Sequence, residues 1–310
     1  MIRYTLSRIF NSFIVLLAII TITFLLMHAI PGGPFTGEKN ISAAVLKNIE
    51  ERYRLNDPLW KQYTDYLLNL IRFDLGPSFK YAGRTVNDII AESFPVSLQL
   101  GLVSIFIAVL LGIPAGAIAA LRQNKWQDYA TMFITTLGVS VPSFVIATIL
   151  IYVFAIKFGL LPAAMWDGIE YMILPALALA AHPTAFIARL TRSSMLEVLA
   201  QDYIKTARAK GLSQTVILYR HALKNALIPV ITYIGPMTAG ILTGSFIIET
   251  IFAIPGLGRH FVTSIYNRDY TVILGVTVFY STLVICLNLL VDLIYPFLDP
   301  RIKLDKRQGG

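Results

Sequence analysis

FPVSLQLGLVSIFIAVLLGIPAGAIAAL, residues 94–121, is a run of 28 residues without Asp, Glu, Lys or Arg. An α-helix rises about 1.5 Å per residue, so about 20 apolar residues cross the ~30 Å hydrocarbon core of a bilayer. The length and composition of this run therefore predict a membrane-spanning helix.

Five further stretches of 18 to 28 residues also lack Asp, Glu, Lys and Arg: 9–30, 129–156, 171–188, 226–248 and 270–291. Hydrophobic residues make up 56% of the 310-residue chain and charged residues 14%, far from the balance of a soluble domain. The sequence predicts an all-α integral membrane protein with six transmembrane helices. We interpret 9–30 as a retained anchor, because its apolar run is longer than that of a signal peptide and Pro31-Gly-Gly33 follows it.

Basic residues predict the orientation of the helices. If the N-terminus is cytoplasmic, the inner segments 1–8, 122–128, 189–225 and the tail hold 15 Lys and Arg residues, and the short outer loops hold only Lys157, Arg259 and Arg268. Lys and Arg are enriched on the cytoplasmic side of short loops. We therefore expect both termini to be cytoplasmic. The net charge of +8 fits this membrane role, and we predict no nucleic-acid partner.

The predicted domains follow from the spans. Residues 1–93 comprise the first helix and a long extracytoplasmic loop. In this loop Asp57 and Pro58 are predicted to be the N-cap and N1 residues of a helix, apolar residues follow at helical spacing, and Gly76-Pro77 ends it. That helix fits either an outer membrane surface or a docking platform for a partner. Residues 94–292 form the transmembrane core, and 293–310 form a cytoplasmic tail.

The inner loop 189–225 is basic and is predicted to form a helical hairpin. Gly211 stands where a C′ glycine with positive φ would end the first helix, and Ser213 stands at the N-cap of the second. The small residues Ala207, Ala209 and Gly211 would form a compact corner that fits a groove on another protein. A solvated connector between two spans is the alternative.

Motifs for an energy source or a catalyst are missing. The chain contains no Gly-Lys dipeptide, so it has no P-loop, and it contains neither H-E-x-x-H nor G-x-S-x-G. The predicted spans carry no Asp, Glu, Lys or Arg, which disfavours an ion-coupled carrier. Cys286 has no partner at metal-ligand spacing. We predict no catalytic, cofactor-binding or metal-binding residues.

The hairpin segments Asp202-Tyr-Ile-Lys-Thr-Ala-Arg-Ala-Lys-Gly-Leu-Ser213 and Arg220-His-Ala-Leu-Lys-Asn-Ala-Leu-Ile-Pro229 resemble the cytoplasmic EAA loop of ABC-importer permeases. The resemblance is to the dipeptide, oligopeptide and nickel branch, and it covers essentially the whole chain. Five other stretches carry it: Pro31-Gly-Gly-Pro34, Asp74-Leu-Gly-Pro-Ser-Phe-Lys80, Pro255-Gly-Leu-Gly258, Asn267-Arg-Asp-Tyr270 and Asp299-Pro-Arg-Ile302. Phe35-Thr-Gly-Glu38 and Gly76-Pro-Ser-Phe-Lys-Tyr81 favour oligopeptide over nickel permeases.

The hairpin departs from the general importer signature at two places. Lys205 stands where the signature has Glu, and His221-Ala-Leu-Lys224 stands where it has Ile-x-Leu-Pro. Ala207 and Gly211 keep their places. The resemblance thus implies an ATPase-coupling loop made of Asp202, Lys205, Thr206, Ala207, Arg208, Ala209, Lys210, Gly211, Leu212 and Ser213.

The resemblance also implies the fold, the partners and the location. The fold would be that of a type I ABC-importer permease in the bacterial cytoplasmic membrane. The chain would form half of an oligopeptide path with a second, similar permease, and an extracytoplasmic peptide-binding protein would deliver the substrate. Two cytoplasmic ATPases would bind ATP-Mg, and this chain would bind no cofactor. Transport of nickel or another small solute is the alternative within the family, and an ion-coupled carrier or channel is the alternative outside it.

Overall fold

The computed structural model describes residues 2–30, 35, 54–243 and 246–298. These residues form helices joined by short turns, and the described ranges contain no β-strand beyond an isolated bridge between Pro77 and Thr85. The predicted motifs Pro31-Gly-Gly-Pro34 and Asp299-Pro-Arg-Ile302, residues 36–38 of the Phe35–Glu38 motif, and the tail after 298 lie outside the described residues. The all-α prediction is confirmed.

Four helices of the described ranges are long and apolar enough to cross a bilayer unbroken. They are α1 (Ile2–Ala29), α4 (Val86–Leu121), α7 (Ile169–Leu199) and α14 (Tyr270–Leu298). Two bent pairs bring the number of candidate spans to six if each pair crosses as one. The first pair is α5 (Trp126–Ser140) with α6 (Ser143–Leu150) and the π-helix η1 (Ile151–Lys157), and the second joins residues 214–226 to α11 (Ile228–Leu242).

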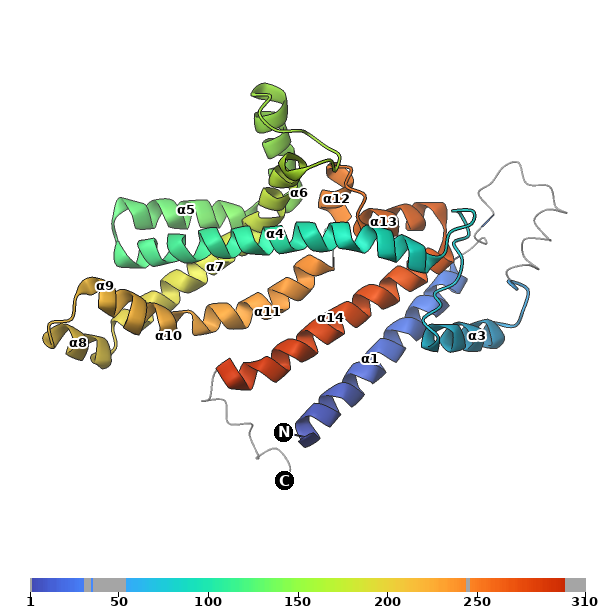
Figure 1. Ribbon diagram of the computed structural model, residues 1–310, viewed down its shortest axis with the longest axis horizontal. Coiled ribbons are helices and arrows are strands. Elements are labelled where there is room, and N and C mark those ends of the chain that lie inside the picture. The colour runs from blue at the N-terminus through green and yellow to red at the C-terminus, as the bar shows by residue number, and fades with distance from the viewer. Residues whose placement is uncertain (1, 31–34, 36–53, 244–245, 299–310) are drawn as a thin grey trace.

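The third predicted span, 129–156, is not a single helix. The chain turns by 109° between Ser140 and Ser143, so the predicted helix 129–156 is a bent pair of helices. Pro142 explains the break, because it lacks an N–H and disfavours the helical conformation of the residue before it. Val141 is accordingly extended, with φ −87° and ψ 125°. Figure 1 shows α6 projecting away from the α4–α5 layer.

Several other helices extend beyond the predicted spans. The spans were predicted from stretches without charged residues, and such stretches mark the part of a helix inside the membrane and not the ends of the helix. Helix α4 begins at Val86, where Thr85 and Asp88 form a capping box, and α7 continues through Arg189 and Arg192 to Leu199. Helix α14 extends to Leu298. The fifth predicted span, 226–248, ends at Leu242, and a separate short helix α12 (Phe246–Ile251) follows.

The predicted outer-loop helix exists as α3 (Leu59–Ile71). Its N-cap position is Pro58, with no side-chain cap, so the prediction of Asp57 as the cap was wrong. Asp57 instead forms an ion pair with Lys61, with Oδ2 and Nζ 2.8 Å apart. The helix ends at Ile71, five residues before the predicted stop at Gly76.

The centre of the molecule is the contact between α4 and α7, the most extensive helix pair among the described residues. Gly112 and Gly116 of α4 lie directly against α7, where an added Cβ would collide with Ile187 and with the Ala188 carbonyl. Gly138 of α5 approaches Ala185 of α7 in the same way. Small residues allow helices in a membrane to approach closely enough for dispersion contacts to hold them together.

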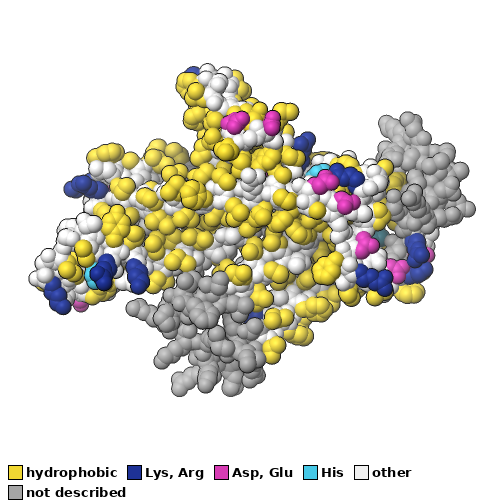
Figure 2. All heavy atoms as spheres, viewed as in Figure 1, with side chains coloured by type: hydrophobic (Ala, Val, Ile, Leu, Met, Phe, Trp, Pro, Cys, Tyr) yellow, Lys and Arg dark blue, Asp and Glu magenta, His cyan; other side chains and the backbone are white. Residues whose placement is uncertain are grey.

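The remaining helices are arranged around this pair (Figure 1). Helices α1 and α14 lie side by side and run in opposite directions, so the start of α1 and the end of α14 lie at the same end of the molecule. The short helices α12 and α13 (Leu257–Asn267) lie at the opposite end from the hairpin that follows α7. Figure 2 shows charged side chains at these extremities and at the tip of the α6 projection, with a mostly apolar surface between them.

The glycine contact predicts a clear difference between two identical substitutions. Gly116→Ala should destabilise the chain, because the methyl group would collide with the Ala188 carbonyl, and such overpacking costs about 1–3 kcal/mol. Gly240→Ala is the matched control, since its methyl group would meet nothing within 4 Å. Thermal unfolding of the purified chain in detergent should show a lower melting temperature for Gly116→Ala only. Equal melting temperatures would contradict the role assigned to this contact.

Candidate coupling site

The hairpin after α7 has the turn that the sequence predicts. Its first limb is α8 (Asp202–Ala209), and its second limb comprises α9 (Gln214–Val216), the π-helix η2 (Ile217–Leu223) and α10 (Lys224–Ala226). Gly211 has φ +75°, which confirms the predicted left-handed position. Ser213 is the N-cap of α9 and its Oγ accepts a hydrogen bond of 3.4 Å from the Val216 N–H, as predicted.

One face of the hairpin is buried against the ends of the spanning helices. Ile204 and Ala207 of α8 are 0% and 7% exposed. They pack with Ala120 at the end of α4, Met195 near the end of α7, and Ile217, Ala222 and Ala226 of the second limb. We call this set the hairpin core. The hairpin is therefore packed onto α4 and α7, so displacement of one should displace the others.

Ala207 corrects an expectation from the sequence. It was predicted to face outward with Ala209 and Gly211, but its side chain points into the hairpin core. Of these three small residues, Ala209 and Gly211 are the exposed ones. Sequence reasoning also missed Ile204, which is fully buried. The available signal was the spacing of Ile204 and Ala207, which places both on one face of α8.

The exterior of the hairpin is basic and partly aromatic. All the other predicted coupling residues are exposed: Asp202, Lys205, Thr206, Arg208, Ala209, Lys210, Gly211, Leu212 and Ser213. Asp202 and Lys205 form an ion pair of 2.8 Å, which stabilises little because both side chains are exposed.

Sequence reasoning missed the aromatic part of this exterior. Tyr203 and Tyr219 are 43% and 65% exposed, and the Tyr203 hydroxyl accepts a hydrogen bond of 3.0 Å from the Asn225 amide. Exposed tyrosines beside cations are typical of surfaces that contact another protein.

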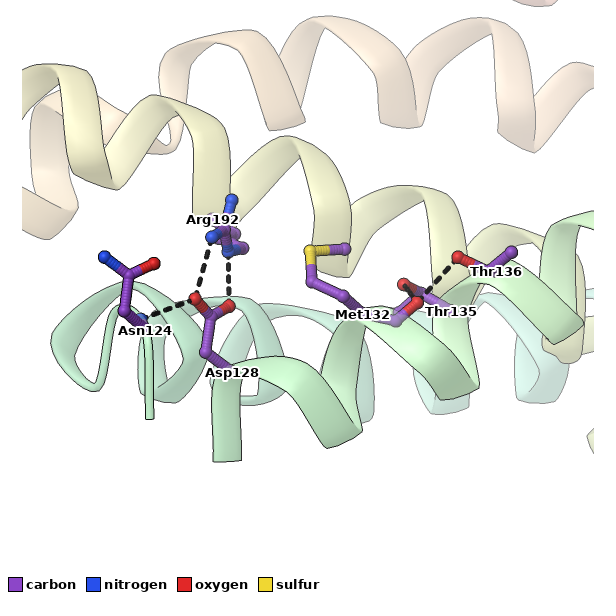
Figure 3. A network of polar contacts seen from close by, with 6 residues as sticks. All are labelled: Asn124, Asp128, Met132, Thr135, Thr136 and Arg192. Atoms are coloured by element: carbon purple, nitrogen blue, oxygen red, sulfur yellow. Dashed lines mark hydrogen bonds and ion pairs between the residues drawn. The ribbon is translucent and has the colours of Figure 1, made fainter. Parts of the chain in front are cut away.

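A buried ion pair connects α5 to α7 near the hairpin (Figure 3). The Arg192 guanidinium donates two hydrogen bonds to the Asp128 carboxylate, Nε to Oδ1 at 2.5 Å and Nη2 to Oδ2 at 2.8 Å. Asp128 is 2% exposed, and its Oδ2 also accepts from the Asn124 N–H at 3.0 Å. Such bidentate pairs fix geometry as well as charge. The start of α5 is thereby held to the part of α7 that leads into the hairpin.

At the opposite end, a buried carboxylate joins two of the motifs found in the sequence. Asp269 is fully buried and accepts hydrogen bonds from the Ser78 hydroxyl and from the backbone N–H groups of Phe79 and Lys80. It also accepts from the Val272 N–H at the start of α14. The segments 74–80 and 267–270, far apart in sequence, are therefore one structural unit.

A second buried carboxylate, Glu249 of α12, organises the turn before α13. It accepts hydrogen bonds from Ser97 Oγ of α4 at 2.9 Å and from the Arg259 N–H at 3.1 Å. A Cβ at Gly256 or Gly258 would overlap this carboxylate, which explains why Pro255-Gly-Leu-Gly258 carries glycine at both positions. Burial raises the pKa of the Glu249 carboxyl, and these hydrogen bonds act in the opposite direction.

These features suit mechanical coupling and do not form a reaction centre. Within the described ranges, no three His, Cys, Asp or Glu side chains gather as a metal site. The buried carboxylates Asp128, Glu249 and Asp269 are occupied by hydrogen bonds that connect segments of the chain. The hairpin instead offers an exposed basic surface on a buried core.

Solved structures define the fold. The chain superposes on a subunit of the inward-facing MetNI methionine ABC transporter with a TM-score of 0.57, covering 68% of this chain and 96% of that one at 19% identity. An amino acid ABC transporter with histidines gives a TM-score of 0.54 at 19% identity, covering 68% and 94%. The chain has the type I ABC-importer permease fold.

The sequence places the chain within a family. Residues 112–304 match the binding-protein-dependent transport system inner membrane component, and residues 1–101 match the N-terminal family of binding-protein-dependent transport membrane components. The chain belongs to the family of binding-protein-dependent transport system inner membrane components, whose members are non-catalytic permease subunits.

Relatives of similar length carry the resemblance over the whole chain. The dipeptide transport system permease DppB of Bacillus subtilis is 54% identical over 307 residues, covering 99% of this chain and 100% of the relative. The oligopeptide transport system permease OppB is 48% identical over 305 residues in both Haemophilus influenzae and Escherichia coli K12, covering 98% of this chain and 100% of each relative.

The Asp128–Arg192 pair gives a testable prediction. Arg192→Met should destabilise the chain by about 1–3 kcal/mol, because it removes two charge-assisted hydrogen bonds and leaves the Asp128 carboxylate with the Asn124 N–H alone. The double variant Asp128→Leu with Arg192→Met should recover much of that loss, since neither charge then remains buried. Melting temperatures of the two variants and the original chain measure the difference. A single variant as stable as the original would show that the pair contributes nothing.

Proposed function

We propose that this chain is the permease subunit of an ABC importer for peptides and forms half of the path through the membrane. Relatives 54% and 48% identical over essentially full length are named for dipeptides and for oligopeptides, which supports peptides as the substrate class. Oligopeptides, which the sequence predicted as the substrate, belong to this broader class of peptides. A second, similar permease would form the other half of the path.

The observation that carries the mechanism is the hairpin core. Ile204 and Ala207 are packed against Ala120 of α4 and Met195 of α7. A force applied to the exposed residues of α8 would therefore reach the two central helices directly. We propose that two cytoplasmic ATPases bind ATP-Mg, that one docks on this hairpin, and that closure of the ATPase pair moves α4 and α7.

The proposed orientation places the hairpin and both termini in the cytoplasm of a bacterium, with the chain in the cytoplasmic membrane. Fifteen Lys and Arg residues on that side against three in the short outer loops support it. Helices α12 and α13 and the Asp269 unit would then face the extracytoplasmic side, where a peptide-binding protein delivers its cargo.

Thiol labelling tests the orientation. Single cysteines at Asp167 and Gln214, each in a Cys286→Ser background, would be exposed to a membrane-impermeant maleimide on intact spheroplasts. We expect labelling at 167 and protection at 214 until the membrane is permeabilised. Labelling of the Gln214→Cys variant from outside would overturn the proposed orientation.

Reconstitution in vesicles tests the function itself. The chain alone should neither hydrolyse ATP nor accumulate a labelled peptide under a proton or sodium gradient. Together with a second permease, two ATPases and a loaded binding protein, it should accumulate peptide in an ATP-dependent way. Uphill uptake by the chain alone would make it a secondary carrier. Accumulation of nickel but not peptide would refute the substrate class and retain the importer class.

Hairpin variants in the same assay test the coupling. Gly211→Val strains a backbone with φ +75° by about 1–2 kcal/mol, and Ala207→Trp overfills the hairpin core. Both variants should reach the membrane, lose peptide import and lose ATPase stimulation by the loaded binding protein. Gln214→Ala, on the exposed side, should import normally. Normal import by both the Gly211→Val and the Ala207→Trp variants would show that the hairpin is only a connector.

A further inference from the structure

We propose that α3 and the residue Phe73 form a membrane-interface anchor, whose apolar face inserts into the outer leaflet of the bilayer. The apolar face is defined by Trp60, Leu68, Ile71 and Phe73, which are 70%, 56%, 75% and 85% exposed. This assigns a lipid-binding surface to the loop between α1 and α4, and it goes beyond the transport function proposed above.

Helix α3 separates three kinds of side chain around its axis. Tyr63 and Tyr66 point toward α1, and Trp60, Leu68 and Ile71 lie on an exposed face at helical spacing. Thr64 is exposed on the same face, and its hydroxyl donates a hydrogen bond of 3.0 Å to the Lys61 carbonyl. The polar residues Lys61, Asp65 and Asn69 follow one another at intervals of four and occupy the third side. A helix in water at the surface of a soluble domain would not leave its apolar face uncovered.

Contacts with α1 fix the depth of α3. Thr21 and Tyr63 share a hydrogen bond of 2.6 Å between their hydroxyls, and His28 Nε2 lies 3.2 Å from Gln62 Oε1. The Phe24 ring lies 5.2 Å from the Tyr63 ring, centroid to centroid. Figure 1 shows α3 beside the end of α1 that lies away from its N-terminus.

That part of α1 belongs to a membrane span. The apolar segment Leu6–Ala29 has a mean hydropathy of 2.6. At about 1.5 Å per residue, Thr21 lies about 12 Å from the end of this span. His28, which contacts Gln62, lies next to the end of the span, so α3 is held beside the last ~12 Å of the span and not in the water beyond it.

The exposed side of α1 at this level shows what covers α3. Ile22, Leu25 and Leu26 are 56%, 55% and 57% exposed, and in a spanning helix such residues face lipid. The apolar face of α3 lies beside the same part of α1, so lipid around that part of α1 would also reach α3. Aromatic residues such as Trp60 and Phe73 are suited to that level, because aromatic rings are favoured at the membrane–water boundary.

Phe73 adds an independent observation. It has φ +58°, a conformation that is unfavourable for a residue with a Cβ, yet its ring is 85% exposed. The surrounding chain holds it there, because the Phe73 carbonyl accepts a hydrogen bond of 2.7 Å from Asn87 Nδ2 and its N–H donates to the Leu70 carbonyl. This left-handed conformation ends α3, because Phe73 is the C′ residue: its N–H bonds to the Leu70 carbonyl, and the Asp74 N–H bonds to the Asn69 carbonyl. Membrane insertion explains why the residue at this exposed position is aromatic.

Site-directed spin labelling tests the anchor in the full chain, reconstituted in phosphatidylcholine–phosphatidylglycerol nanodiscs. Nitroxides would be placed one at a time at Leu68, Ile71 and Asn69 through cysteine, in a Cys286→Ser background. Collision rates with oxygen, which concentrates in lipid, and with a water-soluble nickel chelate would be compared. We expect oxygen to dominate by several-fold at 68 and 71, and the nickel chelate to dominate at 69, the matched control on the polar side.

Two results would overturn the proposal. If the nickel chelate reaches 68 and 71 as readily as 69, the face is open to water and free for a protein partner. If neither oxygen nor the nickel chelate reaches 68 and 71, the face is buried in protein. If labelled variants fold poorly, Trp60 serves as a native probe after Trp126→Phe and Trp166→Phe. Lipids brominated near the headgroup should then quench its fluorescence, and absence of quenching would refute insertion.

Discussion

The close contact between α4 and α7 is the constraint on which the rest of the structure depends. Gly112 and Gly116 bring the backbone of α4 against Ile187 and Ala188 of α7, leaving no room for a Cβ. Apolar burial drives little association within lipid, so a contact of this kind must come from shape and from polar bonds. Helix α5 joins the pair through Gly138 and the Asp128–Arg192 ion pair, and the hairpin follows α7 and packs on the ends of both helices.

The helices α4 and α7 are connected to other segments at both ends, and dispersion contacts hold them together in the middle. At the hairpin end, Ile204 and Ala207 are buried against Ala120 and Met195. At the other end, Glu249 connects α12 and the start of α13 to Ser97 of α4. A displacement of the hairpin can therefore reach the opposite end of the molecule through α4 itself, as the proposed coupling to partner ATPases requires.

The sequence predicted the features that depend on local chemistry. Charge-free runs located the helices, and the turn at Gly211 and the cap at Ser213 followed from backbone geometry. Long-range partners were not predictable from one sequence: Asp128 meets Arg192 across 64 positions and Ser78 meets Asp269 across 191. The side chain of Ala207 was assigned to the wrong face, because a small residue fits a docking corner and a tight core equally well. The direction of the chain after Pro142 likewise depends on packing that a hydropathy pattern does not contain.

The central claim, that the hairpin and the central helices move as one body, can be measured by electron paramagnetic resonance in the assembled transporter. Spin labels at Gln123, just after α4, and at Gln214 on the hairpin report the distance across the hairpin core. The account predicts a narrow distance distribution that stays unchanged between the nucleotide-free and ATP-bound states, because the hairpin core moves with α4. A distribution that shifts or broadens on ATP binding would show the hairpin moving independently of the helices and would contradict the account.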